Sequence, residues 1–315
     1  MKKLLITGIG GFVAHYFIEY LNKSNLKYEI LGIDISENVE CNYSNYTYKQ
    51  VNLRDKDLIR DVLKAFQPDY ILHLASISSV SQSWQQPVES FVNNTNIFLN
   101  IIETIRELKL DTRILSVGSS EEYGNYPEYE MPLQEDYKLL PCNPYAVARV
   151  SQEMLSKLYA DNFGVNIVMT RSFNHIGPKQ KEIFVIPSFV KQLVSIKNNP
   201  IENLMEVGNL EIVRDFLDVR DVVDAYYKLL TGGRIGEVYN VCSSKGVKLK
   251  EIIDIISKKL NITPEIKIDP KRVRPTDNLV IIGDNSKIKN ELDWTPKYSL
   301  EATLQDMICD IQGEL

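Results

Sequence analysis

The sequence predicts an α/β fold, in which a doubly wound parallel sheet is followed by a smaller, mixed α/β C-terminal domain. Strand-like apolar runs alternate with amphipathic helical patterns over about half of the 315 residues, which is typical of a parallel sheet with helices on both faces. A strand, a glycine turn and a helix follow one another at the start of the chain. After Arg171 the alternation stops and prolines recur, which indicates a second domain built from separate pieces.

The first strand, Leu4–Thr7, leads into Gly8, Gly11 and Ala14 at three-residue spacing, and a helical pattern follows. This order brings the N–H groups of a helix N-terminus close to a pyrophosphate. Gly8 permits a tight turn, and Gly11 permits close approach of the backbone. A simple turn is the alternative for so short a motif, but its flanks favour a Rossmann dinucleotide-binding domain.

The second strand, Tyr28–Ile33, ends at Asp34, which lies 20 residues after Ala14. A carboxylate here accepts hydrogen bonds from the hydroxyls of an adenosine ribose, and it repels the 2′-phosphate of NADP. The sequence therefore predicts NAD(H) as cofactor, with NADP(H) less favoured. An ordinary surface acid is the alternative for this residue.

The later elements continue the pattern and divide the chain into two domains. Residues 1–173, with 215–245 returning to them, are expected to form the dinucleotide-binding domain, and 174–214 with 246–315 the second domain. The cleft is expected at the carboxyl ends of the parallel strands. Further strands are predicted over 46–51, 70–74, 113–117, 165–170 and 238–241, and helices over 55–66, 88–110, 143–163, 249–260 and 300–311.

Composition excludes several classes of function. Hydrophobic residues make up 44% and charged residues 25% of the chain, as in ordinary globular proteins. The net charge of −6 argues against a nucleic-acid partner, and no apolar run is long enough to span a membrane. Three histidines and four scattered cysteines show no metal-ligand spacing. We therefore expect a cytoplasmic protein with no metal.

Three side chains predict the chemistry. Ser119 directly follows the fifth strand, Tyr145 begins the next helix, and Arg149 lies one turn later on the same helix face. A phenol holds its proton too tightly to act as a base at neutral pH, but a nearby cation favours the phenolate. Ser119 would hold a carbonyl or hydroxyl group while Tyr145 gives or takes its proton. Hydride transfer at a nicotinamide would complete an alcohol–ketone interconversion.

These residues and the glycine turn resemble the extended short-chain dehydrogenase/reductase superfamily over nearly the whole chain. Segments 118–124, 143–149, 171–180, 184–193 and 208–223 are similar to members that modify GDP-sugars, above all reductases and 4,6-dehydratases. The resemblance implies NADH-dependent reduction of the 4-keto group of a GDP-6-deoxy-hexose. A GDP-sugar 4,6-dehydratase or 4-epimerase that recycles NAD in place is the first alternative, and an NAD-binding protein with weak or no catalysis is the second.

The resemblance also implies which residues form the site. Asn174, Arg214 and Arg274 would bind the nucleotide diphosphate, for which arginine is well suited, although ordinary ion pairing is the alternative. Residues expected at the cofactor are Gly8, Gly11, Phe12, Val13, Asp34, Ile35, Asn52, Leu53, Leu74, Ala75, Ser76, Tyr145, Arg149 and Phe173. Residues expected at the substrate are Ser120, Asn174, Phe184, Val185, Arg214 and Arg274.

Two positions need separate comment. Arg149 stands where the superfamily has lysine, so the positive charge is kept while contacts to the nicotinamide ribose are expected to change. Glu121 matches the acid that removes a proton beside the 4-keto group in the dehydratases, and reductases of the subgroup carry the same acid. Its neighbour Glu122 is expected in solvent.

Members of the superfamily pair through two helices. Here these would be the helices predicted over 88–110 and 143–163, which carry apolar residues on more than one side. The resemblance therefore implies a homodimer or a dimer of dimers, with a GDP-sugar as substrate.

Overall fold

The centre of the molecule is a sheet of seven parallel strands in the order β10-β6-β5-β4-β1-β2-β3. The structure, a computed structural model, describes residues 1–272 and 278–313. The chain moves outward from β1 in both directions, so the predicted doubly wound α/β fold is confirmed. The strands are Lys2–Thr7 (β1), Tyr28–Asp34 (β2), Tyr46–Gln50 (β3), Tyr70–His73 (β4), Arg113–Ser119 (β5), Ile167–Ser172 (β6) and Val238–Val241 (β10).

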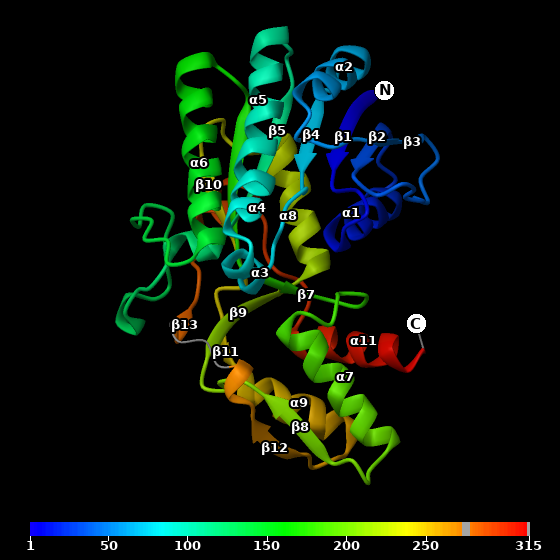
Figure 1. Cartoon of the computed structure of the whole chain (residues 1–315), viewed down its shortest axis with the longest axis vertical. Coiled ribbons are helices and arrows are strands. Elements are labelled where there is room, and N and C mark those ends of the chain that lie inside the picture. The colour runs from blue at the N-terminus through cyan, green and yellow to red at the C-terminus, as the bar shows by residue number, and fades with distance from the viewer. Residues whose placement is uncertain (273–277, 314–315) are drawn as a thin grey trace.

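Helices cover both faces of this sheet, and α5 and α6 lie side by side along one of them (Figure 1). Side chains alternate along β1: Leu4 and Ile6 pack against α1 and α8, whereas Leu5 packs against the cluster that holds α2 and α5. This alternation follows from the period of two of a strand. The helices are Phe12–Lys23 (α1), Lys56–Phe66 (α2), Ile97–Leu108 (α5), Pro144–Phe163 (α6), Val219–Gly232 (α8) and Ser286–Leu292 (α10).

A smaller group of elements lies beyond the carboxyl ends of the large sheet (Figure 1). Its strand β9 pairs with β7 and β13 in parallel and with β11 antiparallel, while β8 pairs with β12. Helices α7, α9 and α11 share one apolar cluster. These elements are Asn174–Ile176 (β7), Val185–Asn198 (α7), Leu204–Val207 (β8), Val213–Asp218 (β9), Gly246–Lys248 (β11), Leu249–Leu260 (α9), Glu265–Ile268 (β12), Val280–Ile281 (β13) and Leu300–Gln312 (α11).

The division into two domains at the predicted residues stays a prediction. The strand predicted over 238–241 does join the large sheet, beside β6. The predicted boundary between 214 and 215 falls inside β9, which pairs only with strands of the smaller group among the described residues.

Several predicted elements differ from the structure in their bounds. The helix predicted over 88–110 is three pieces, Pro87–Phe91 (α4), a π-helical turn Val92–Asn96 (η1) and α5, and a short helix Val80–Gln85 (α3) precedes them. The strand predicted over 113–117 continues to Ser119, and the one predicted over 165–170 runs from 167 to 172. Each shift is one or two residues, within the usual uncertainty of element ends.

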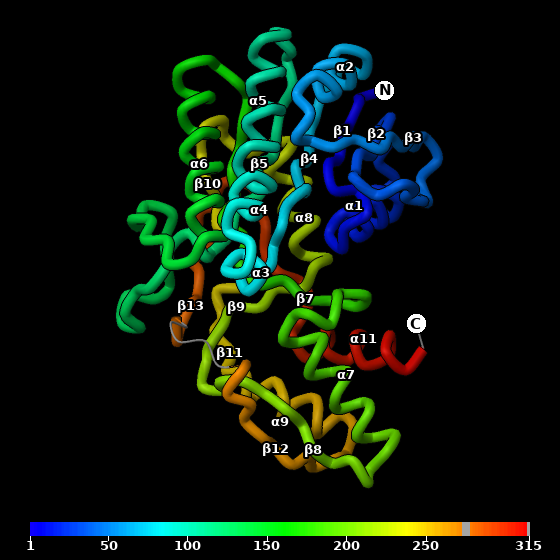
Figure 2. Tube along the Cα trace, viewed as in Figure 1, coloured from blue at the N-terminus to red at the C-terminus, as the bar shows by residue number. Residues whose placement is uncertain are grey.

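The connection between β5 and α6 extends to one side of the molecule (Figure 2). It begins with a 3-10 turn, Ser120–Tyr123 (η2), and includes a second one, Glu128–Glu130 (η3). The later chain returns beside it, because Leu133 bridges to Gly283 and the Asn278 amide donates to the Gly124 carbonyl over 2.7 Å. A last 3-10 turn covers Pro270–Arg272 (η4).

Within residues 1–272 and 278–313, no helix combines the length and apolar character needed to cross a membrane. The same residues contain no group of three or more His, Cys, Asp or Glu side chains that could hold a metal ion.

Candidate active site

The glycine turn between β1 and α1 has the form that a pyrophosphate requires. Gly8 has φ +70°, and a Cβ atom at this position would lie 2.8 Å from the backbone nitrogen of Ala75. Gly11 precedes α1, and neither a side-chain cap nor an acidic residue occupies the first turn of that helix. The N–H groups at the start of α1 therefore remain available to an anion.

Asp34 ends β2 beside this turn. Its carboxylate accepts N–H bonds from Gly10 over 3.0 Å and from Ser36 over 3.1 Å, and it also accepts the Ser36 hydroxyl. These contacts fix the carboxylate next to the glycine turn. The following residue, Ile35, is 71% exposed.

Two further segments reach the same edge of the sheet. Thr7 Oγ1 accepts the N–H groups of Leu74 and Ala75, each over 3.1 Å, and thereby holds the chain after β4 against the glycine turn. Ser76 follows them and is half-buried. After β3, Leu53 is buried, whereas Asn52 is exposed and accepts the N–H of Arg54 over 3.1 Å. Asn52 thus caps a turn, the alternative role of such a residue.

Two aromatic residues predicted at the cofactor are engaged in packing. The Phe12 ring meets the Tyr16 ring edge-on and stacks with His175 at a centroid separation of 6.3 Å. The Phe173 ring is buried beside Tyr123. Val13, the second residue of α1, is half-buried.

Ser119, Tyr145 and Arg149 converge where β5 ends and α6 begins. Asn143 caps α6 by accepting the N–H of Ala146 over 2.8 Å, which places Tyr145 in the first turn. The Arg149 guanidinium carbon lies 5.2 Å from the centre of the Tyr145 ring, within the range of a cation–π contact.

Arg149 is also tied to the strand that carries Ser119. Its Nη1 donates to the carbonyl of Val117 over 3.0 Å and to Gln152 Oε1 over 2.7 Å. The side chain of Arg149 is only 4% exposed. Strand β5 and helix α6 are therefore locked together at the reactive positions.

Glu121 and Ser120 follow Ser119 in the η2 turn. Glu121 is half-buried, and its Oε2 accepts the Asn143 amide over 2.9 Å. Asn143 therefore joins Glu121 to the helix that begins with Tyr145. Ser120 is buried.

The expectation that Glu122 lies in solvent is wrong. Glu122 is fully buried, and its Oε1 accepts the N–H of Ser119 over 2.6 Å. Because the η2 turn folds back on Ser119 as a capping box, the side chain points into the protein.

Four of the predicted substrate residues belong to the smaller group of elements. Asn174 begins β7, Phe184 and Val185 stand at the start of α7, and Arg214 lies in β9. The Nη1 of Arg214 donates to the carbonyl of Val213 over 2.9 Å. The predicted residue Arg274 lies outside the described residues.

Comparison with known proteins agrees with this geometry. Residues 5–307 match the protein family described as GDP-mannose 4,6 dehydratase. The chain belongs to the GDP-mannose 4,6-dehydratase family. It is 29% identical over 314 residues to GDP-6-deoxy-D-mannose reductase from Pseudomonas aeruginosa, covering 100% of this chain and 98% of that protein. It is 25% identical to GDP-mannose 4,6-dehydratase from Yersinia enterocolitica, covering 99% and 94%.

Solved structures extend this likeness to the fold of the GDP-mannose 4,6-dehydratase family. The structure of RMD from Pseudomonas aeruginosa complexed with NADPH superimposes with a TM-score of 0.88, at 28% identity and full coverage of both chains. The present chain is accordingly an NAD(P)-dependent enzyme of the oxidoreductase type. The uncapped first turn of α1, the space kept by Gly8 and the fixed Asp34 carboxylate fit a nicotinamide dinucleotide.

Sequence reasoning missed three residues that organise this site. Asn143 was visible as a helix cap, because an asparagine before a proline is a common helix start. Gln152 lies three residues after Arg149, on the same helix face, so the spacing gave a signal. Ser36 lies two residues after Asp34, the spacing at which an aspartate side chain accepts a backbone N–H in a turn, so this contact also had a local signal.

Proposed function

We propose that the chain is an NADH-dependent reductase that acts on the 4-keto group of a GDP-6-deoxy-hexose. The observation that carries this proposal is the convergence of Ser119, Tyr145 and Arg149, with Arg149 bonded to the strand end that leads to Ser119. The similarity to a GDP-6-deoxy-D-mannose reductase along the full chain supports this substrate class.

Each of the three residues has a defined part in the proposed reaction. The Ser119 hydroxyl donates to the 4-keto oxygen and holds it beside Tyr145. Tyr145 gives its phenolic proton to that oxygen, so that the ketone becomes a secondary alcohol. The nearby Arg149 cation stabilises the phenolate that remains. When bound, a nicotinamide dinucleotide supplies the hydride that goes to the carbonyl carbon.

The preference for NADH over NADPH rests on Asp34. Its carboxylate is fixed at the end of β2 by Gly10 and Ser36, and a 2′-phosphate brought to this position would be repelled. The similar reductase structure contains NADPH, so kcat/KM must be measured with both cofactors. A strong preference for NADPH would refute this part of the proposal.

The proposed reaction is tested with GDP-4-keto-6-deoxy-mannose. Purified protein should consume NADH in its presence, and NMR should show a 6-deoxy sugar reduced at carbon 4. Tyr145→Phe should lower kcat by at least about a hundredfold, since it removes the proton donor. Tyr129→Phe is the matched control, because Tyr129 is 85% exposed in the connection after β5. Absence of turnover by the wild-type protein contradicts the proposal.

A 4,6-dehydratase or 4-epimerase is the second candidate, favoured by the placement of Glu121. Asn143 holds the Glu121 carboxylate over the start of α6, where it can take a proton from a bound sugar. This candidate requires turnover of a GDP-hexose without added NADH, which Glu121→Gln would abolish. If neither assay gives turnover, the chain binds the cofactor with weak or no catalysis.

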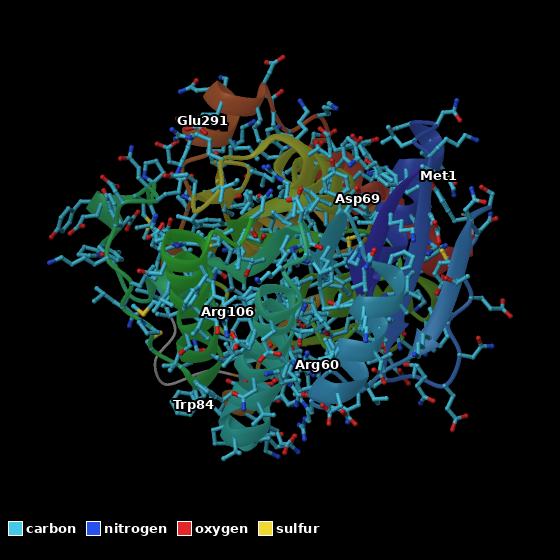
Figure 3. All side chains as sticks on the ribbon, turned by 90° about the horizontal axis from the view of Figure 1, so that it is seen from above. Met1, Arg60, Asp69, Trp84, Arg106 and Glu291 are labelled. Atoms are coloured by element: carbon cyan, nitrogen blue, oxygen red, sulfur yellow. The ribbon has the colours of Figure 1, made fainter. Side chains whose placement is uncertain are left out.

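We propose a homodimer, or a dimer of dimers, formed through the helical segments 88–110 (α4, η1 and α5) and 143–163 (α6). These segments carry exposed apolar side chains, among them Val88 of α4 and Met154 and Leu158 of α6, and the exposed Trp84 of α3 lies at the edge of the molecule (Figure 3). Light scattering should give at least a dimer at micromolar concentration, and Met154→Glu with Leu158→Lys should give a monomer. Ile201→Lys, on an exposed residue of the smaller group, is the control.

A further inference from the structure

Glu122 is a buried acid that the proposed reaction does not use. It belongs to the η2 turn directly after Ser119, and no part of its side chain reaches solvent. One carboxyl oxygen, Oε1, accepts the N–H of Ser119 over 2.6 Å. The other, Oε2, has no donor among the residues that the structure describes. An ionised carboxylate left in this state would be strongly destabilising.

The charged groups that face Glu122 come from two elements, Glu153 on α6 and Arg171 on β6. Arg171 is itself buried and already donates hydrogen bonds to other groups. Its Nε and Nη2 donate to the two oxygens of Glu153 over 2.8 and 2.7 Å, and its Nη1 donates to the carbonyl of Glu135 over 3.0 Å. Two carboxyl groups therefore share one guanidinium, and the hydrogen bonds of that guanidinium go to Glu153.

The carboxyl group of Glu153 lies close enough to act on the carboxyl group of Glu122. Two ionised carboxylates cannot hydrogen-bond to each other, because neither has a proton to donate. A single proton between them supplies the missing donor and removes one buried charge. This is the arrangement expected when two acids share a site.

We propose that Glu122 is a neutral carboxylic acid at physiological pH, which donates from Oε2 to Glu153 and positions Ser119 through Oε1. The proposal rests on the proposed function only in that Ser119 is taken to hold the substrate oxygen. Burial and the neighbouring Glu153 raise the pKa of Glu122 well above its usual range, in agreement with this arrangement. Glu122 acts through Ser119 and is a positioning residue.

Loss of this proton has a defined consequence. Ionised Glu122 faces ionised Glu153 in a buried site, and their repulsion pushes the η2 turn away from α6. The Ser119 N–H then loses its acceptor, and the Ser119 hydroxyl moves relative to Tyr145. The rate is therefore expected to fall on the alkaline side as Glu122 ionises.

The kinetic test compares kcat across pH in the wild-type protein and three variants, E122Q, E122A and the control E265Q. In E122Q the amide oxygen can still accept from Ser119, and the amide N–H can donate to Glu153, but nothing ionises. E122A should lower kcat at neutral pH by about tenfold, the effect of one lost buried hydrogen bond. E122Q should restore most of that loss and should lack the alkaline fall that wild type shows. E265Q, at an exposed site on β12, should keep the wild-type profile, and a wild-type profile in E122Q would overturn the proposal.

A second test needs no substrate, so it separates this proposal from the proposed function. Because the pKa of Glu122 is raised in the folded state, its protonated form stabilises the protein below 4.5, its usual value, and this stabilisation is lost as pH rises. The Tm of wild type should therefore fall relative to E122Q by about 2 °C per pH unit above that value.

E153Q should also remove this dependence of Tm on pH, because Arg171 is then free to pair with an ionised Glu122. This second variant keeps the test decisive if E122Q does not fold. A constant Tm difference between wild type and the folded variant at all pH values would show that Glu122 is ionised, and the proposal would fail. Failure of the reductase assay alone would leave this result standing.

Discussion

His73 is a buried histidine whose protonation state follows from counting hydrogen bonds. Thr7 Oγ1 accepts two backbone N–H groups, from Leu74 and Ala75, which occupy its lone pairs. Its hydroxyl proton must therefore go to His73 Nδ1, 2.9 Å away. Nδ1 is then an acceptor, so the ring is neutral with its proton on Nε2. Burial lowers the pKa of His73 to about 3, which also favours the neutral ring.

This arrangement predicts acid sensitivity. In the unfolded chain a histidine binds a proton near pH 6.5, but folded His73 does not until about pH 3. Its contribution to stability is complete above pH 6.5 and is lost as pH falls below that value. Urea unfolding at pH 7 and pH 5 should show a loss of about 2 kcal/mol from this residue. The glutamine side chain in His73→Gln can still accept a hydrogen bond from Thr7 but does not titrate. The stability that this variant loses between pH 7 and pH 5 should therefore be about 2 kcal/mol smaller than in wild type. An equal loss in both proteins would contradict the assignment.

Arg149 allows a second prediction at this scale, because its two roles are separable. Arg149→Lys keeps a cation near Tyr145, but a lysine is a single point charge that cannot reproduce the arginine fork. We expect kcat to fall by about tenfold, with weaker cofactor binding as Gln152 loses its partner. Arg149→Met should cost at least about a hundredfold, since no cation remains. If Arg149→Met were as active as Arg149→Lys, the charge would have no part in the reaction.

At the residue scale the sequence predicted what depends on spacing. Tyr145 and Arg149 lie four residues apart on a helix, and Ser119 ends a strand, so their convergence could be foreseen. Glu122 could not, because its neighbour in the fold, Glu153, lies 31 positions farther along the chain. Most glutamates are exposed, and a tertiary contact of this kind leaves no local pattern.

The helical segment before β5 shows how one element can depart from its periodic pattern. A π-helical turn, η1, joins α4 to α5 and carries Asn94 and Thr95 inward, where both are buried. Thr95 Oγ1 donates to the Ala148 carbonyl of α6 over 2.9 Å. The Asn94 amide donates to the carbonyls of Ile77 and Ser90, and its Oδ1 accepts the N–H of Ile77.

We therefore expect that both removing the Asn94 amide and replacing it with a charged group will destabilise the protein. Asn94→Ala should lower the free energy of unfolding by about 2 kcal/mol, since it leaves the buried polar groups of Ile77 without partners. Asn94→Asp should cost more, about 3 kcal/mol, because a carboxylate oxygen would face two carbonyls in place of the amide. Denaturant unfolding measures both changes. Asn96→Asp is the matched control on the exposed side of the same turn and should change stability by less than about 0.5 kcal/mol.

The sequence predicted a helix here because apolar residues recur at helical spacing on both sides of the π turn. The turn itself adds one residue to a hydrogen-bonded ring and leaves the overall composition unchanged. The π turn is caused by tertiary contacts, because Asn94 hydrogen-bonds to the loop at Ile77 and Thr95 hydrogen-bonds to α6. Such a requirement is not readable from the segment alone.

For the whole molecule, the alternation of strands and helices was enough to predict the doubly wound sheet, because each parallel strand needs a crossover helix. The return of Val238–Val241 to that sheet was also predictable, since a short segment with valine at both ends and a tyrosine, residue types favoured in strands, stands out after α8. The arrangement of the smaller group of elements could not be predicted from the sequence. Strand β13 is two residues long, and it pairs with β9 across 67 positions of the chain, Val213 to Val280.

Asp215 holds this arrangement together at one buried point. It lies in β9, and its carboxylate accepts the N–H groups of Ser243, Ser244 and Gly283 over 2.8, 2.9 and 3.3 Å, as well as the Ser243 hydroxyl. These donors come from the chain after β10 of the large sheet and from the chain after β13. One side chain therefore joins the smaller group of elements to the edge of the large sheet.

Asp215→Asn should consequently weaken the whole molecule rather than one element. An asparagine offers one acceptor oxygen and turns an N–H donor toward backbone N–H donors, so at least two buried bonds are lost. We expect the free energy of unfolding to fall by about 3 kcal/mol. Because Arg214 stands next to this point on β9, KM for the keto sugar should also rise more than kcat falls. Asp254→Asn, on an exposed position of α9, should change neither quantity. A D215N protein with wild-type stability would mean that the two sheets are held in place by their apolar contacts alone.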